Sequence, residues 1–256
     1  MPTQSPSPQP WRVCVTRDEP VDGPLAAALR AQAFLPVLCP VLTLAPPADP
    51  GPLDEAARDL EGYDWIVCAS ARAVVALSSL RQGPWPSTLQ AAAVGATTAQ
   101  ALRDAGVASP VTADEGGAEP LWAALAGIAS WPGTRVLVPT TPGGRTVLAE
   151  QLRAAGARVD DVEAYRMVPR DPGAVARDWT AAAPEAVVIA SPRVARCLAG
   201  AVGAGALARL HAVVAIGATT AAALHDLAVP CVTASATSFA SAAATLAARR
   251  AAKVHG

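Results

Sequence analysis

The sequence has little charge and few aromatic side chains. Charged residues make up 16% of the 256 residues, aromatic residues make up 4%, and the formal net charge is −1. A nearly neutral chain has no overall attraction for nucleic acid or for an anionic membrane surface, so an anionic ligand must be bound by locally clustered arginines. No apolar run approaches the roughly 20 residues of a membrane span. We therefore expect a soluble protein that binds neither nucleic acid nor membrane.

Several catalytic motifs are also missing. The sequence has no G-x-x-x-x-G-K-[ST] phosphate loop, and the G-A-G at Gly203 does not follow a strand, so nucleotide binding is not supported. The three histidines, His211, His225 and His255, are not spaced as metal ligands. No Ser/His/Asp or Cys/His set is supported by its spacing either. Covalent and metal-dependent catalysis are thus not favoured.

Cysteine usage and the first residues indicate the compartment. The five cysteines are an odd number, lie mostly inside apolar runs and form no C-x-x-C pair, which is typical of reduced thiols in a cytoplasmic protein. The start, M-P-T-Q-S-P-S-P-Q-P, lacks the basic and apolar regions of a secretion signal. We expect residues 1–10 to be a disordered leader.

Two pairs of matched segments recur along the chain. The stretch V-A-I-G-A-T-T-A-A-A-L at 214–224 repeats V-G-A-T-T-A-Q-A-L at 94–102, and A-V-V-I-A-S-P-R from Ala186 repeats W-I-V-C-A-S-A-R from Trp65. Both pairs come in the same order, about 120 residues apart, which indicates a duplicated α/β unit. Each segment reads as a strand, a tight turn and a helix start.

A strand count predicts how the chain is divided. The middle section has five strands, near residues 65, 91, 111, 135 and 159, whereas the last section has three and needs the first strands of the chain to complete a sheet. We therefore expect two similar parallel-sheet α/β lobes joined by a two-stranded extended linker, the first lobe being discontinuous. The predicted ranges are 11–36 with 172–256 for lobe 1, 45–162 for lobe 2, and 37–44 with 163–171 for the linker strands.

Hydroxyl groups, glycines and arginines follow the strands. In open parallel sheets, ligands bind beyond the carboxyl ends of the strands, and helix starts there present free N–H groups. If the lobes face each other through these edges, the cleft is lined with groups suited to carboxylates. The predicted binding residues are Thr16, Arg17, Ser70, Arg72, Gly95, Thr97, Thr98, Thr140, Gly143, Gly144, Arg145, Ser191, Arg193, Gly217 and Thr219, with Thr220 beside them.

Each of these residues also has a purely structural interpretation. The serines and threonines are ordinary helix N-cap residues. Tyr165, on the return crossing between the lobes, is either a cross-strand packing residue or a hydroxyl that donates a proton or hydrogen bond to a leaving group. Tyr63, beside Asp64 and before a strand, is expected to be structural.

Taken together, these motifs resemble the uroporphyrinogen-III synthase family. The resemblance is carried by V-C-V-T-R, the two S-x-R turns, the paired G-x-T-T-A-x-A-L turns, G-G-R-T-V-L-A-E-Q-L-R-A-A-G-A-R-V, V-E-A-Y-R and A-S-A-T-S-F-A-S-A-A-A-T-L. It covers nearly the whole chain after residue 10. It implies two α/β lobes with a two-stranded linker, and conversion of hydroxymethylbilane to uroporphyrinogen III with loss of water, inversion of ring D and no cofactor.

The resemblance also implies roles for particular residues. Tyr165 matches the linker tyrosine that assists departure of the hydroxyl, and Thr220 and Thr98 match functional threonines of the two G-x-x-T-A turns. The predicted catalytic residues are Tyr165 and Thr220. Alanines before both serines, and Ala33 after the first helix, depart from the family pattern. We expect a monomer that binds a linear tetrapyrrole polycarboxylate. The alternative is a two-lobed binding or regulatory module that closes on an acidic small molecule without chemistry.

Overall fold

The chain forms two compact units. The computed structural model describes residues 9–113, 117–143 and 147–254. Unit 1 is made of Met1–Thr43 and Val168–Gly256, and unit 2 is Leu44–Met167. The predicted leader, residues 1–10, lies outside the described residues apart from Gln9 and Pro10.

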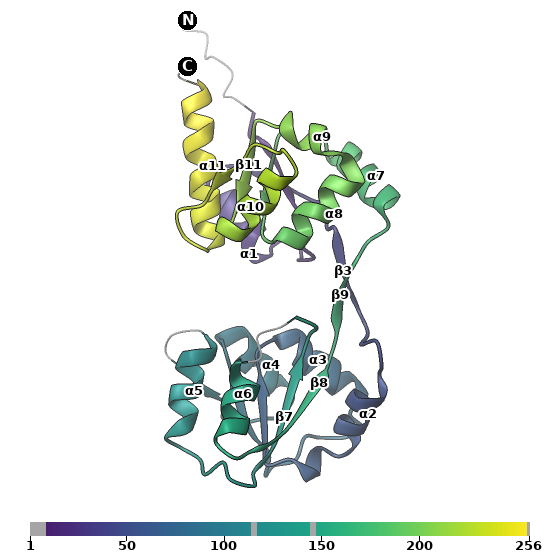
Figure 1. Ribbon diagram of the computed structural model, residues 1–256, viewed down its shortest axis with the longest axis vertical. Helices are drawn as coiled ribbons and strands as arrows, with labels where there is room; N and C mark the ends of the chain where they lie inside the picture. Colours follow the sequence, from purple (N-terminus) through teal and green to yellow (C-terminus); the bar gives the residue numbers. More distant parts are fainter. Residues whose placement is uncertain (1–8, 114–116, 144–146, 255–256) are drawn as a thin grey trace, which may run out of the picture. The chain divides into compact units, whose positions relative to one another are not determined.

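Unit 1 is built around a parallel sheet of five strands with the order β12-β11-β10-β1-β2 (Figure 1). The central strands read R-V-C-V, A-V-V-I and A-V-V-A and are almost entirely buried, as expected for parallel strands covered on both faces. The elements of unit 1 are β1 (Arg12–Val15), α1 (Pro24–Ala31), β2 (Leu35–Leu38), α7 (Pro172–Ala182), β10 (Ala186–Ile189), α8 (Pro192–Val202), α9 (Ala204–Ala208), β11 (Ala212–Ala215), α10 (Ala218–Asp226), β12 (Val232–Thr233) and α11 (Phe239–Val254).

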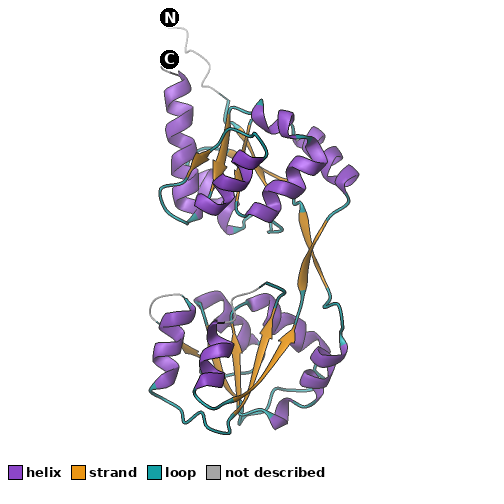
Figure 2. Cartoon of the chain, in the orientation of Figure 1, coloured by secondary structure: helices purple, strands orange, loops and turns teal. Residues whose placement is uncertain are grey.

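Helices cover both faces of this sheet. Alternate strand residues such as Val13 and Val188 pack with α1 and α11, while their neighbours Cys14 and Val187 pack with α7, α8 and α10. Unit 1 therefore has three layers, and Figure 2 shows the sheet between its helices.

Unit 2 repeats this architecture. Its parallel sheet has the order β6-β5-β4-β7-β8. One face packs against α2, α3 and α4, and the other packs against α5 and α6. Its elements are α2 (Gly51–Arg58), the 3₁₀ turn η1 (Leu60–Gly62), β4 (Trp65–Cys68), α3 (Ala71–Leu80), β5 (Gln90–Ala93), α4 (Ala96–Asp104), β6 (Val111–Thr112), α5 (Ala118–Ala126), β7 (Arg135–Thr140), α6 (Val147–Ala154) and β8 (Arg158–Glu163).

The two strand orders correspond position by position. β10, β11 and β12 of unit 1 match β4, β5 and β6 of unit 2, while β1 and β2 match β7 and β8. The first strands of the chain thus complete the sheet formed by its last section. The predicted fold class, two parallel-sheet lobes of which the first is discontinuous, is confirmed.

The two crossings between the units pair as a two-stranded sheet of β3 (Leu42–Ala45) and β9 (Arg166–Pro169) (Figure 1). The predicted linker ranges, 37–44 and 163–171, are too wide. Val37 and Leu38 belong to β2, where they pair with Cys14 and Val15, and residue 163 is the last of β8. The boundary was predicted at Pro36, because a proline often ends a strand. A proline is tolerated in an edge strand such as β2, which continues to Leu38.

Candidate functional site

In each unit, three turns meet at one edge of the sheet. The strands β5, β4 and β7 are neighbours in unit 2, and β11, β10 and β1 are neighbours in unit 1. Because all are parallel, the loops after them lie at the same carboxyl edge, where ligands bind in such sheets. The residues that begin these turns are Ser70, Gly95 and Thr140 in unit 2 and Ser191, Gly217 and Thr16 in unit 1.

Both S-x-R turns begin with a helix N-cap. The Ser70 hydroxyl accepts a hydrogen bond from the Arg72 N–H at 3.2 Å, and the Ser191 hydroxyl accepts one from the Val194 N–H at 3.3 Å. The structural interpretation of these serines is therefore correct for both turns. It leaves Ser70 with a second contact that Ser191 does not make among the described residues.

That second contact is with Tyr165. The Tyr165 hydroxyl lies 3.0 Å from the Ser70 hydroxyl, and either oxygen can be the donor. The Tyr165 ring is half-buried and packs against the unit 2 core, so the tyrosine has a packing role as well. Beside it, an N–H group of Arg72 donates to the Met167 sulfur at 3.3 Å. Two hydroxyls and a guanidinium group thus lie next to one another where β9 begins.

The G-A-T-T turns, in contrast, begin helices that no side chain caps. Gly95 and Gly217 are the N-cap residues of α4 and α10, in extended conformations with φ of −159° and −165°. A Cβ at Gly95 would meet no atom within 4 Å, and one at Gly217 would meet only the Thr237 hydroxyl, at 3.8 Å. The backbone N–H groups at these helix starts are therefore open to an anionic ligand.

The two threonines of each turn differ in exposure. The first is exposed in both units and the second is buried, with 6% exposure at Thr98 and 2% at Thr220. Thr97 and Thr219 therefore present hydroxyls at the helix starts. The catalytic role predicted for Thr220 stays a prediction, and its buried side chain lies in the first turn of α10.

The first turn of unit 1 is occupied by a side chain of the protein itself. The Glu19 carboxylate accepts a hydrogen bond from the Ala26 N–H at 2.9 Å, at the start of α1. The Arg17 Nε lies 3.3 Å from the same carboxylate, and the guanidinium group stacks on Phe239 at 4.6 Å. The Thr16 side chain is buried and its hydroxyl donates to the Val188 carbonyl at 3.3 Å. An acidic side chain at a helix start is favourable, but the seven-residue separation of Glu19 and Ala26 is not a sequence pattern that predicts this contact.

The remaining predicted residues differ in their surroundings. The Thr140 hydroxyl donates to the Asp161 carboxylate at 2.8 Å. Gly143 has φ of +71°, a conformation that favours glycine. Arg193 is exposed and has no ion pair or hydrogen bond to another described residue. Gly144 and Arg145 lie outside the described residues.

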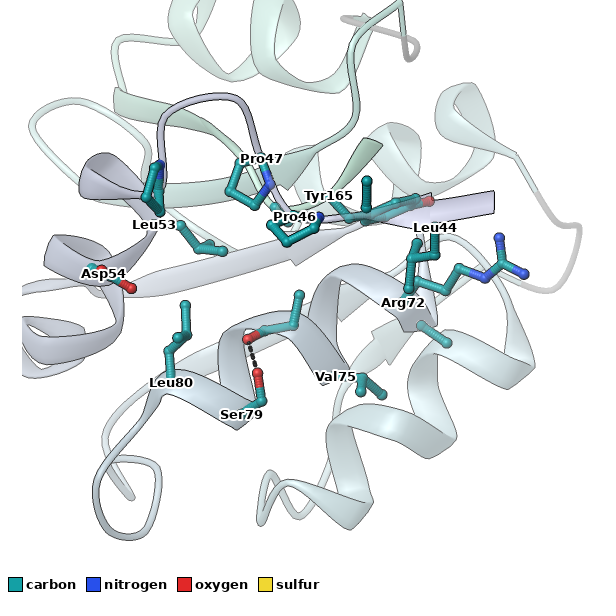
Figure 3. A pocket seen from close by; sticks show the side chains of 15 residues that line it. Leu44, Pro46, Pro47, Leu53, Asp54, Arg72, Val75, Ser79, Leu80 and Tyr165 are labelled. Carbon is teal, nitrogen blue, oxygen red and sulfur yellow. Dashed lines mark hydrogen bonds between the residues drawn. The ribbon is translucent and has the colours of Figure 1, made fainter. Parts of the chain in front are cut away.

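An apolar pocket of about 540 Å³ lies within unit 2, between α2, α3 and the segment 44–50. Figure 3 shows Tyr165 and Arg72 at one end of it and Asp54 at the other. Leu44, Val75 and Leu80 lie along its walls and are all exposed. The sequence does not predict this pocket, because its only signal there is apolar residues on the outer side of a predicted helix.

A second pocket in unit 2 is lined by charged groups that satisfy one another. The Tyr63 hydroxyl donates to Asp160 at 2.8 Å, and the Arg135 guanidinium group stacks on the Tyr63 ring and pairs with Asp59 and Asp160. Burial, followed by the hydrogen bond to Asp160, raises the pKa of Tyr63 to about 12. This neutral, hydrogen-bonded phenol has the structural role that the sequence predicts.

One thiol, Cys39, has its pKa lowered, chiefly by its hydrogen bond with Cys14, but its side chain is fully buried. All five cysteines are free, and Cys14 and Cys68 are fully buried. Burial raises the pKa of the Cys68 and Cys231 thiols, and the pKa of Cys14 is raised by its hydrogen bond with Cys39 and then by burial. Within the described ranges, no group of three or more His, Cys, Asp or Glu side chains is arranged to hold a metal ion. None of the helices there has the length and apolar character that crossing a bilayer requires.

The fold and these turns define a class: an α/β protein of two duplicated parallel-sheet units with open helix starts suited to acidic ligands. Residues 23–244 match the model of the family described as uroporphyrinogen-III synthase HemD. The chain belongs to this family.

Individual relatives agree with this assignment. The chain is 34% identical over 162 residues to a uroporphyrinogen-III synthase of Synechococcus elongatus, which covers 60% of the chain and 59% of that relative's length. Solved structures of a mutant uroporphyrinogen III synthase of Thermus thermophilus and of uroporphyrinogen-III synthetase of Helicobacter pylori share the fold. Their TM-scores are 0.54 and 0.59 at 20% and 17% identity, covering 94% and 93% of the chain and 99% and 98% of the solved chains.

Proposed function

We propose that this protein is a uroporphyrinogen-III synthase. It would convert hydroxymethylbilane to uroporphyrinogen III, with loss of water and inversion of ring D, and without a cofactor. Membership of the family supports the reaction type. The observation that carries the proposal is the pair of hydroxyls at Ser70 and Tyr165, 3.0 Å apart and next to the Arg72 guanidinium group.

The proposed chemistry begins with departure of the hydroxyl from the ring A methylene. The pyrrole nitrogen supplies the electron pair that breaks the C–O bond, and the Tyr165 phenol donates a hydrogen bond or proton to the leaving oxygen, which departs as water. Ring D then attacks the methylene carbon to form a spiro intermediate, which fragments and closes with ring D reversed. When Ser70 donates to the phenol oxygen, it stabilises the negative charge that develops there.

Binding of the substrate carboxylates is the second part of the proposal. We assign this role to the uncapped starts of α4 and α10, to the exposed hydroxyls of Thr97 and Thr219, and to Arg72 and Arg193. Ring closure without the enzyme gives the type I isomer, so the protein must hold the reacting groups of the substrate in the positions that lead to type III. Holding reacting groups in place can lower a barrier by roughly 7–11 kcal/mol in favourable cases.

The other predicted residues have narrower roles in this proposal. Thr98 and Thr220 are buried, so we assign them to holding the helix starts rather than to contact with the substrate. Arg17 is paired with Glu19 and stacks on Phe239, so we assign it to holding the turn after β1 beside the substrate. Gly143 would shape the turn after β7. We further propose that the protein acts as a monomer in the cytoplasm, a compartment that suits five free cysteines.

The test is an isomer assay. Purified protein is given fresh hydroxymethylbilane, and the products are oxidised and separated. Mainly type III product is expected. Type I product alone, at the rate of the blank, would contradict the proposal and favour a non-catalytic binding module.

The role of Tyr165 is tested by comparing substitutions of the two tyrosines of the protein, Tyr165 and Tyr63. Tyr165→Phe should slow turnover roughly 100-fold, since a positioned acid contributes about 10²–10⁴-fold, and should leave the fold intact. Tyr63→Phe is the matched control, because Tyr63 is bonded to Asp160 and takes no part in the proposed site. An unchanged rate for Tyr165→Phe would remove its proton-donor role.

A further inference from the structure

The turn that carries Tyr165 is only two residues long. β8 ends at Glu163 and β9 begins at Arg166. Its first residue, Ala164, is 1% exposed, and its N–H donates to the Thr140 carbonyl at 2.8 Å, which extends the pairing of β7 with β8 by one residue. The backbone before Tyr165 is therefore anchored to the sheet of unit 2.

An ion pair joins the two residues on either side of the turn. The Arg166 Nε donates to one Glu163 oxygen at 2.6 Å, and a terminal N–H of Arg166 donates to the other at 2.8 Å. This paired geometry is more rigid than a single contact. Both side chains are partly exposed, and exposed ion pairs add little to stability, so stability alone does not account for this arrangement.

Glu163 also lies near the backbone of the segment that follows β3. The Arg166 guanidinium group, and then the Ala48 N–H, hold the pKa of Glu163 below its ordinary value.

Packing alone does not confine the Tyr165 ring. Tyr165 and Ala164 line the apolar pocket of about 540 Å³, so there is space beside the ring (Figure 3). A phenol with space beside it can leave the Ser70 hydroxyl unless its backbone is held. The ion pair closes the four-residue segment 163–166 around the tyrosine and supplies this restraint.

We propose that Glu163 and Arg166 are positioning residues for Tyr165. Their ion pair fixes the turn so that the phenol stays at the Ser70 hydroxyl. The inference rests on the proposed function, in which Tyr165 assists departure of the substrate hydroxyl. It assigns a role to two side chains whose bidentate ion pair is with each other. Misplacement of a catalytic group by about 1 Å can cost roughly 100-fold in rate.

The test is a double-mutant cycle on the full-length protein with hydroxymethylbilane as substrate. Arg166→Gln should lower kcat roughly 10- to 100-fold, with KM and the thermal midpoint nearly unchanged. In the Tyr165→Phe background the same change should have no further effect, because the group that it positions is already gone. Glu163→Gln breaks the same ion pair from the other side and should have the same effect on kcat. It replaces Arg166→Gln as the test if that variant folds poorly.

Asp178→Asn provides the matched control. It breaks another partly exposed ion pair, with Arg170 at 2.9 Å just after β9, and should leave kcat unchanged. Wild-type kcat for both Arg166→Gln and Glu163→Gln, with a slow Tyr165→Phe, would overturn the positioning role and leave the proposed function intact. Equal losses from Arg166→Gln in both backgrounds would also overturn it. A wild-type rate for Tyr165→Phe would remove both the proton-donor role and the inference.

Discussion

The two units have the same sheet and the same turns but different groups around those turns. The serine after β10, Ser191, caps its helix, whereas the serine after β4, Ser70, caps its helix and also contacts Tyr165. In unit 1 the turn after β1 is occupied by Glu19. The shared cap chemistry preserves the scaffold in both copies, and the added hydroxyl pair distinguishes unit 2. In the proposed function, the chemical step therefore belongs to unit 2.

The cores of the units also differ. Both units bury large aliphatic side chains completely, including Leu29, Leu198 and Leu246 in unit 1 and Leu77, Leu121 and Leu137 in unit 2. The central strands of unit 1 are filled mainly by valine and alanine. Each unit therefore has its own aliphatic core, and unit 2 adds several buried aromatic side chains such as Trp65 and Trp131.

The largest expected loss of stability comes from removing one large buried side chain from a single unit. Leu137→Ala, in β7, should lower the free energy of unfolding by about 2–5 kcal/mol, the cost of lost burial and of the cavity left behind. Hydrogen exchange of fragments should show loss of protection in α3 and β7 but not in β10 and β11. Leu29→Ala is the control for unit 1. Equal loss of protection in both units would contradict independent cores.

Helix ends give a smaller and more specific contrast. Gly156, two residues after the end of α6, has φ of +94°, and Ala33, two residues after the end of the counterpart helix α1, has φ of +55°. Both ends close with the same pair of backbone hydrogen bonds. Gly156→Ala should cost about 1–2 kcal/mol, because of this conformation and because its Cβ would lie 3.1 Å from the Pro132 Cα.

The reverse change is the control for that prediction. Ala33→Gly should change stability by less than about 1 kcal/mol, since relief of strain is offset by the greater entropy of glycine in the unfolded chain. Urea unfolding measures both variants. A larger loss for Ala33→Gly than for Gly156→Ala would mean that the two helix ends are not equivalent.

The serines test the functional difference directly. Ser70→Ala and Ser191→Ala should each lower stability by about 1 kcal/mol through loss of an N-cap. Only Ser70→Ala should also lower kcat, up to about tenfold, since a neutral hydrogen bond contributes about 0.5–1.5 kcal/mol. Steady-state kinetics should instead show Ser191→Ala acting mainly on KM. Equal falls in kcat would contradict the assignment of the chemical step to unit 2.

Much of this fold could be predicted because the duplication is written in local patterns. Apolar strands followed by S-x-R or G-A-T-T mark strand ends and helix starts, and five strands per sheet required the chain to return to its first lobe. The linker boundaries could not be predicted, because the Leu35–Leu44 run is equally apolar in β2 and in β3.

The site was predictable in its residue types but not in its contacts. Ser70 and Tyr165 are 95 positions apart in the sequence, and no local sequence pattern predicts that their hydroxyls come into contact. Glu19 was missed for a different reason. Its carboxylate contacts the N–H of a residue seven positions later, which depends on the path of the loop rather than on sequence spacing.

The last prediction concerns Tyr63, which lies in unit 2, as Tyr165 does. The pKa of Tyr63 is raised to about 12, above the ordinary value of about 10, so the folded state holds this proton more tightly than the unfolded chain does. The stability it contributes is complete below pH about 10 and is lost as the pH rises to about 12. Tyr63→Phe should therefore cost about 1 kcal/mol at neutral pH and weaken the alkaline loss of stability. Urea unfolding at stepped alkaline pH measures this, and tyrosinate absorbance should lose its component near pH 12. An unchanged titration curve would show that the hydrogen bond to Asp160 does not hold the phenol proton in solution.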